Sequence, residues 1–109
     1  MKFYYQNHLI RTSKTHNYKY AVIDKETFRA YRCSQNMKGI QAAINEIGKK
    51  YELLISVQNG TYIQKSKNCY TAEEIEKEQI KYYGSLQNAI DSEKDYINSF
   101  VVVELEAKN

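Results

Sequence analysis

The stretch Tyr51–Ile63, YELLISVQNGTYI, is where the local sequence patterns agree most clearly. Leu53, Ile55 and Val57 alternate with other residues, as in a strand with one buried face. The dipeptide Asn59-Gly60 follows, and both residue types tolerate the positive φ angles of a two-residue type I′ turn. The three residues after it are β-branched or aromatic, which suits a return strand. This stretch predicts a β-hairpin that places Leu53, Ile55 and Val57 in the core.

The N-terminal third also has strand patterns. Phe3–Arg11 is rich in aromatic residues and predicts an edge strand. Tyr18–Asp24 and Phe28–Cys33 predict a second hairpin, joined by a four-residue turn over 24–27. In its first strand we expect one face to hold Tyr18, Tyr20 and Val22, and the other face to hold Lys19, Ala21 and Ile23.

A short helix is predicted between the two hairpins, over residues 36–47. Ser34 or Asn36 is the expected N-cap, and Gly48 is expected to end the helix in the left-handed conformation. The apolar stripe of this helix follows the helical period and consists of Met37, Ile40, Ile44 and Ile47, with Ala43 beside it.

The C-terminal part predicts a long helix and a last strand. The helix begins near Thr71, where Thr-Ala-Glu-Glu forms a capping box and an acidic first turn. Gly84-Ser85 and Asp91-Ser92 are both candidate breaks in this helix. Phe100–Leu105 then changes to β-branched residues and predicts a final strand.

These elements together predict the α+β class. We expect a mostly antiparallel sheet built from two hairpins, with one short helix and one long C-terminal helix packed on it. The chain has 109 residues, which predicts a single domain over residues 1–109.

The apolar residues of the chain indicate in which cellular compartment the protein is found. The longest apolar run, Phe100–Val103, is far shorter than the ~20 residues of a membrane span. The N-terminus lacks the apolar core of a signal peptide. These features predict a cytoplasmic protein without a membrane partner, in which Cys33 and Cys69 are free thiols.

Charge is divided unevenly along the chain. Residues 1–51 hold ten Lys and Arg against three Asp and Glu, a net +7, whereas residues 52–109 hold six against ten, a net −4. The division indicates either a bipolar surface that docks on a charged partner or two halves that interleave in three dimensions and largely cancel.

No motif for catalysis or cofactor binding is present. His8 and His16 have no spacing to Cys33 or Cys69 that would predict a nucleophile pair or a Cys₂His₂ zinc site. The four glycines form no phosphate-binding loop. We therefore expect no enzyme activity, no cofactor and no metal.

Tyrosines that lie close to basic residues in the sequence are a clearer indication of function than the histidines or cysteines. The chain has 11 tyrosines. Such residues stack bases and neutralise phosphates in single-stranded nucleic-acid sites, and they are also enriched in protein–protein hot spots. A third interpretation is that Tyr and Lys are frequent because their codons are A/T-rich, as in the genes of an A/T-rich genome, and that many tyrosines pack in the core. The candidate partner-binding residues are Tyr18, Lys19, Tyr20, Arg29, Tyr31 and Arg32, and the acidic row Glu73, Glu74, Glu76 and Glu78.

In size, composition and lack of catalytic motifs, the chain resembles the small accessory proteins of phages and other mobile elements, among which anti-CRISPR and other anti-defence inhibitors are the best-known functional group. The resemblance implies a non-catalytic protein that covers a working surface of a host or defence protein such as a Cas nuclease. The acidic row would then imitate a row of phosphates in a basic groove. The alternative is a small nucleic-acid-binding protein that uses the basic, tyrosine-rich N-terminal half, and the sequence leaves a homodimer open.

Overall fold

The computed structural model describes residues 1–109 and confirms the α+β class. The elements in chain order are β1 (Lys2–Tyr5), β2 (His8–Thr12), β3 (Tyr20–Asp24), β4 (Ala30–Ser34), α1 (Met37–Asn59), α2 (Ala72–Tyr83), α3 (Leu86–Asn98), β5 (Phe100–Glu104) and β6 (Glu106–Lys108). The chain divides into two compact units. The sheet unit comprises Met1–Ile47 and Asn98–Asn109, and the helical unit comprises Gly48–Ile97. The single domain expected from chain length stays a prediction.

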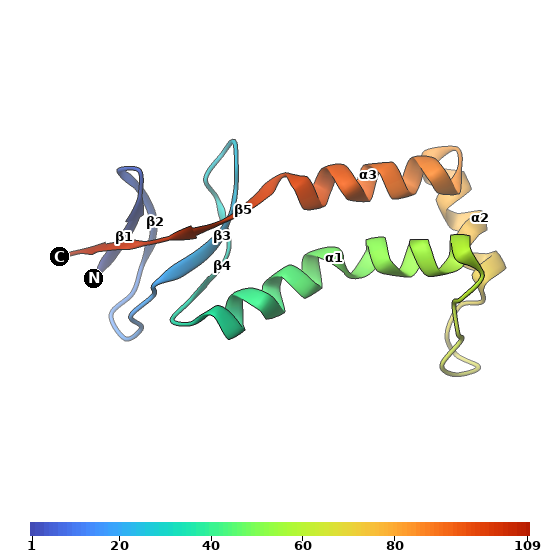
Figure 1. Ribbon diagram of the computed structural model, residues 1–109, viewed down its shortest axis with the longest axis horizontal. Coiled ribbons are helices and arrows are strands. Elements are labelled where there is room, and N and C mark those ends of the chain that lie inside the picture. The colour runs from blue at the N-terminus through green and yellow to red at the C-terminus, as the bar shows by residue number, and fades with distance from the viewer. The chain divides into compact units, whose positions relative to one another are not determined.

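The sheet unit contains two three-stranded sheets in which every pairing is antiparallel (Figure 1). Their strand orders are β2-β1-β6 and β4-β3-β5. β5 and β6 are consecutive strands separated by Leu105 alone, so one C-terminal segment supplies an edge strand to both sheets. The N–H of Leu105 donates to the carbonyl of Lys19 (2.8 Å) at the point where the segment passes between the sheets.

The predicted edge strand over Phe3–Arg11 is in fact a hairpin. β1 and β2 pair from Lys2 opposite Thr12 to Tyr5 opposite His8. The turn residues Gln6 and Asn7 have φ angles of 47° and 66°, so both central positions are left-handed, as a type I′ turn requires. The sequence pattern missed this turn because it contains no glycine.

The predicted hairpin over 18–33 is confirmed as β3 and β4, with a bulge between Val22 and Ile23. Ala21, Val22 and Ile23 are all fully buried, so both faces of β3 are covered. The core of this unit includes Ala21, Ile23 and Val103, together with half-buried side chains such as Phe28 and Cys33.

The predicted hairpin over Tyr51–Ile63 is wrong, because α1 runs from Met37 to Asn59 without interruption. Ile40, Ile47 and Leu54 are buried at intervals of seven residues, which is helical spacing. Gly48 does not end the short helix predicted over 36–47. A Cβ added there would meet no atom within 4 Å, so this glycine lies on an open part of the helix surface.

Both ends of α1 have cap interactions. The Asn36 Oδ1 accepts a hydrogen bond from the Gly39 N–H (3.1 Å), which confirms Asn36 as the N-cap. At the other end Gly60 has a φ of 73° and donates to the carbonyl of Val57, while the N–H of Thr61 donates to the carbonyl of Ser56 (2.9 Å). This pair of bonds is a Schellman motif, which satisfies the last carbonyls of the helix.

The predicted long C-terminal helix is two helices. α2 begins with the expected capping box, in which Thr71 and Glu74 exchange hydrogen bonds, and ends at Gly84 with a φ of 88°. α3 follows after Ser85 and passes through Asp91 without a break. Of the two predicted breaks, only the one at Gly84-Ser85 is present.

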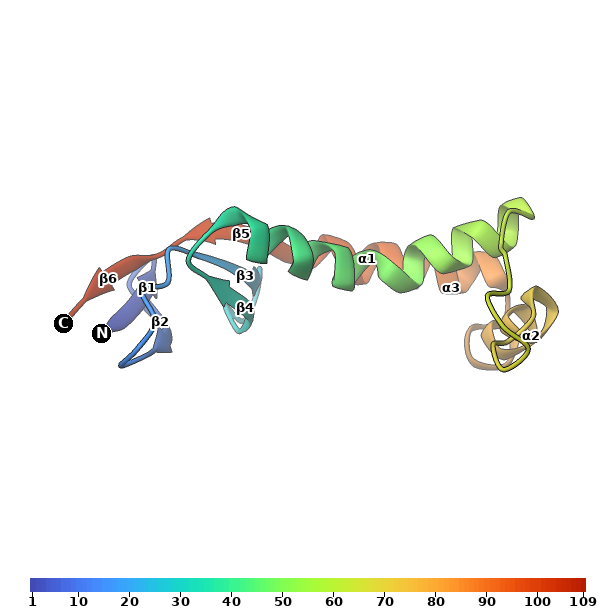
Figure 2. The ribbon, with the colours of Figure 1, turned by 90° about the horizontal axis from the view of Figure 1, so that it is seen from below.

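The helical unit has a core of its own. Leu54, Ile75, Ala89 and Ile90 bring α1, α2 and α3 together. The Gln58 side chain donates to that of Gln87 (2.8 Å), and Lys50 pairs with Glu93 (3.4 Å), so this part of α1 and α3 run antiparallel. α2 lies next to the end of α1 and the beginning of α3 (Figure 1, Figure 2).

Candidate functional site

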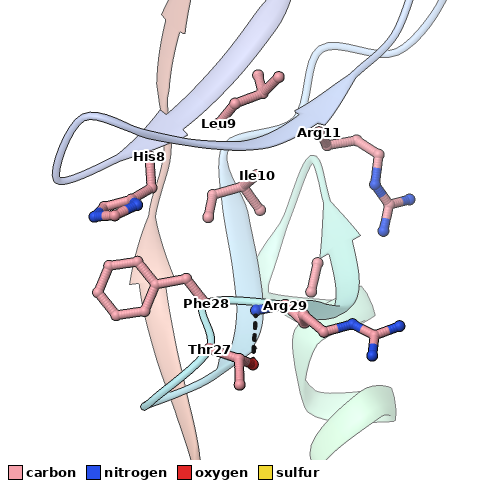
Figure 3. A pocket seen from close by; sticks show the side chains of 8 residues that line it. His8, Leu9, Ile10, Arg11, Thr27, Phe28 and Arg29 are labelled. Carbon is pink, nitrogen blue, oxygen red and sulfur yellow. Dashed lines mark hydrogen bonds between the residues drawn. The ribbon is translucent and has the colours of Figure 1, made fainter.

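A groove in the sheet unit lies between β2 and the segment that enters β4, and its volume is about 370 Å³ (Figure 3). Strands β2 and β4 contact each other, although each is an edge strand of a different sheet. Eight residues line the groove: His8, Leu9, Ile10, Arg11, Thr27, Phe28, Arg29 and Ala30. We call this feature the arginine groove, because Arg11 and Arg29 are its charged residues.

The turn before β4 sets the shape of the arginine groove. The Asp24 carboxylate accepts hydrogen bonds from the N–H groups of Thr27 and Glu26 (both 2.9 Å), and these bonds lower the pKa of the Asp24 carboxyl. Phe28 ends the turn with a φ of 62°, in the left-handed region. Its ring packs against the rings of Tyr5 (5.4 Å between centroids) and His8 (4.7 Å). This packing offsets the strain that a left-handed non-glycine residue carries.

Both arginines of the groove lack an ion-pair partner. The two ion pairs of the molecule join Arg32 to Glu46 and Lys50 to Glu93. The sequence pattern identified Arg29 as a candidate but missed Arg11, which no tyrosine adjoins in the chain. Only the contact between edge strands of two different sheets brings the two cations to one groove.

Tyr31 and Arg32, two of the predicted partner-binding residues, contact a carboxylate of the same unit. The Tyr31 hydroxyl donates to Glu46 Oε2 (3.0 Å), and Arg32 Nη2 donates to the same oxygen (2.8 Å). The Arg32 guanidinium also lies 5.9 Å from the centre of the Tyr31 ring. These contacts join β4 to α1, so Arg32 is less available to a partner than Arg29.

The run Tyr18-Lys19-Tyr20 does not form one exposed platform. The Tyr18 ring stacks on His16 (5.3 Å, 2° between planes) and meets Phe3 edge-on (5.4 Å). Lys19 is exposed, and its backbone bonds to Ser34 and Leu105. Tyr20 is half-buried within β3. Of the three, Lys19 has the most accessible side chain.

The acidic row on α2 separates into two pairs. Glu74 and Glu78 share one face of the helix, and Glu73 and Glu76 share another, because residues three or four apart are neighbours. The Glu74 carboxylate accepts from the Thr71 N–H (3.1 Å) within the capping box. The four glutamates therefore do not make a continuous row.

A shallow trough runs along α2 and has a volume of about 380 Å³. Tyr70 and Tyr82 are 65% and 67% exposed there, although both have large apolar rings. The Lys81 ammonium lies 5.5 Å from the centre of the Tyr82 ring. The residues of this tyrosine trough are Tyr70, Glu74, Lys77, Glu78, Lys81 and Tyr82.

The histidines and cysteines come partly together. His16 and Cys33 line one shallow pocket, but His16 Nδ1 bonds with Thr15 Oγ1 (3.0 Å) and not with the thiol. Burial raises the pKa of the Cys33 thiol, and the nearby charge of Arg11 opposes that rise. Cys69 is exposed in a loop of the helical unit. No three His, Cys, Asp or Glu side chains are grouped as a metal site would require.

Comparison with known proteins gives no relative. No family model matches the chain, and neither the curated proteins nor the solved structures contain a match. None of the three helices combines the length and the apolar character that crossing a membrane requires.

Proposed function

We propose that this protein is a binding protein of a phage or mobile element that acts by covering the surface of a host defence protein, as an anti-CRISPR-type inhibitor of a Cas nuclease does. It has no catalytic step of its own in this proposal. The observation that carries the proposal is the tyrosine trough on α2.

The side chains of the tyrosine trough suit a protein partner. Tyr70 and Tyr82 leave about two thirds of their surface in water, and buried tyrosines are among the residues that dominate protein–protein binding energy. Glu78 and Lys81 flank them with charges of both signs, which favours a complementary protein surface over a uniformly charged polymer. The trough also retains the hydroxyl groups of both tyrosines for hydrogen bonds at the rim of an interface.

Inhibition of DNA cleavage by purified Cas nucleases tests this proposal. We expect stoichiometric inhibition of at least one effector from an A/T-rich host, and we expect a Tyr70→Ala/Tyr82→Ala variant to lose it. Tyr96→Ala is the matched control, because Tyr96 is an exposed tyrosine of the same unit outside the trough. Inhibition that survives the double change, or that Tyr96→Ala removes equally, contradicts the assignment of the trough.

Nucleic-acid binding is the second candidate function, and the charge of the sheet unit favours it. This unit holds nine Lys and Arg against five Asp and Glu, a net +4, whereas the helical unit holds seven against eight. The sheet unit therefore keeps most of the positive charge that residues 1–51 carry in excess. A gel shift with free oligonucleotides separates this candidate from the inhibitor.

A further inference from the structure

We propose that the arginine groove is a binding site for the backbone phosphates of single-stranded nucleic acid, with Arg11 and Arg29 as its phosphate ligands. This proposal deepens the second candidate function. It does not depend on the tyrosine trough, which lies in the other unit.

The arginine groove is positively charged. Its eight lining residues include two arginines and one histidine, but no aspartate or glutamate. Like charges that line one groove repel each other, and a carboxylate neighbour normally relieves that repulsion, as Glu46 does for Arg32. Arg11 and Arg29 have no such neighbour, so a bound anion would relieve the repulsion between their guanidinium groups.

The chemistry of arginine identifies the anion. A guanidinium presents a planar fork of N–H donors that matches two oxygens of one phosphate. The two side chains extend toward the same side of the groove, away from His8 and Phe28 (Figure 3). Two such forks, one on β2 and one on the segment that enters β4, suit an anion with repeated phosphates better than a single small ion.

The backbone around Arg29 is fixed before any ligand arrives. The Arg29 N–H donates to Thr27 Oγ1 (3.3 Å), and its carbonyl accepts from the Asp24 N–H (2.9 Å). The preceding Phe28 is the left-handed residue of the turn. Strained residues of this kind concentrate at binding sites, where the strain positions a neighbouring side chain.

The aromatic residues of the groove favour single strands over a duplex. His8 is exposed, and its ring meets Phe28 edge-on at 4.7 Å. The histidine ring lies on the opposite side of the groove from the two arginine side chains (Figure 3), where an unpaired base of a bound strand can stack on it. In a duplex the bases stack on each other, so they offer no free face to such a ring.

Fluorescence anisotropy with a labelled oligothymidine strand tests the proposal on the full chain. We expect Arg11→Gln/Arg29→Gln to weaken binding by about tenfold or more. The slope of log affinity against log salt should also fall by about 1.4, because each phosphate contact on a single strand contributes about 0.7. Lys14→Gln/Lys38→Gln is the matched control, because it removes the same charge from exposed positions of the same unit outside the groove. The control should bind within about threefold of the original protein, since it removes only long-range attraction.

A variant that conserves charge distinguishes specific phosphate binding by the two guanidinium groups from nonspecific electrostatic attraction. Arg11→Lys/Arg29→Lys keeps both charges but removes the planar forks, so we expect weaker binding with a nearly unchanged salt slope. Circular dichroism on every variant establishes that it is folded. The proposal is overturned if the original protein does not bind the strand at low salt, if the lysine control weakens binding as much as the groove variant, or if a duplex of the same length binds more tightly.

Discussion

Leu53 and Leu54 are adjacent in the sequence, and replacing each with alanine distinguishes a helix from a strand over residues 51–63. In α1 the Leu54 side chain is fully buried in the core of the helical unit, whereas that of Leu53 is 37% exposed. A hairpin would reverse the two positions, because its pattern buries Leu53 with Ile55 and Val57.

The expected cost follows from burial. Leu→Ala at a fully buried position costs about 2.7–5.0 kcal/mol, because the lost transfer energy adds to the cavity that remains. We expect Leu54→Ala to lie in this range, since its neighbours Ile75 and Ala89 belong to the same packed cluster. Leu53→Ala should cost less, about 1–2 kcal/mol, because alanine is the best helix former and 37% of the leucine is already in water.

Urea unfolding followed by far-ultraviolet circular dichroism measures both free energies of unfolding. The helices dominate this spectrum, so the assay reports on the unit that contains Leu54. A cost for Leu53→Ala that equals or exceeds that for Leu54→Ala would refute the helical register, and with it the assignment of the helical core.

Two further predictions concern the start of α2 and the two thiols. Thr71→Ala should lower the free energy of unfolding by about 1 kcal/mol, whereas Thr71→Ser should retain most of it, because a serine oxygen can still accept from the Glu74 N–H; equal losses in urea unfolding would contradict the cap. At mildly alkaline pH, iodoacetamide should alkylate Cys69 before Cys33, because burial raises the pKa of the Cys33 thiol and reduces its thiolate fraction. Arg11→Gln should slow Cys33 further, since the arginine opposes that rise, and mass spectrometry that finds Cys33 modified first would contradict this order.

The error over residues 51–63 has a physical explanation. Leu53, Ile55 and Val57 alternate as in a strand, but Leu54 continues the seven-residue spacing of Ile40 and Ile47. A short apolar run satisfies both periods, and tertiary packing decides between them. Asn59-Gly60 was equally ambiguous, because a type I′ turn and a helix C-terminus both need a residue with positive φ.

Capping chemistry was a reliable guide to where helices begin, whereas the C-cap predicted at Gly48 is wrong. The oxygens of Asn36 and Thr71 accept hydrogen bonds where the sequence predicted helices to begin. Gly84 ends α2 as one of the two predicted breaks. Such contacts involve residues within a few positions of one another, so a sequence contains all of the information that they need.

The candidate site was less predictable, because its residues are distant in the chain. Arg29 was identified beside Tyr31, but Arg11 joins it only because strands of two sheets meet. Arg32 is close to the same tyrosine in the sequence, yet Glu46 from α1 neutralises it. No local sequence pattern shows which of these three arginines is neutralised. That difference arises from contacts between residues that are 14 or more positions apart.

The shared C-terminal segment sets an order of assembly during synthesis. β5 completes one sheet beside β3 and β6 completes the other beside β1, so neither sheet has its third strand until residues 100–108 exist. Translation proceeds at about 5–20 residues per second, so the β3–β4 hairpin precedes its last partner by about 3.5–14 s. During that interval β1 and β3 both present an unpaired edge, which is the feature that promotes strand addition between chains. The nascent sheet unit is therefore most prone to aggregate while the ribosome is still making the helices.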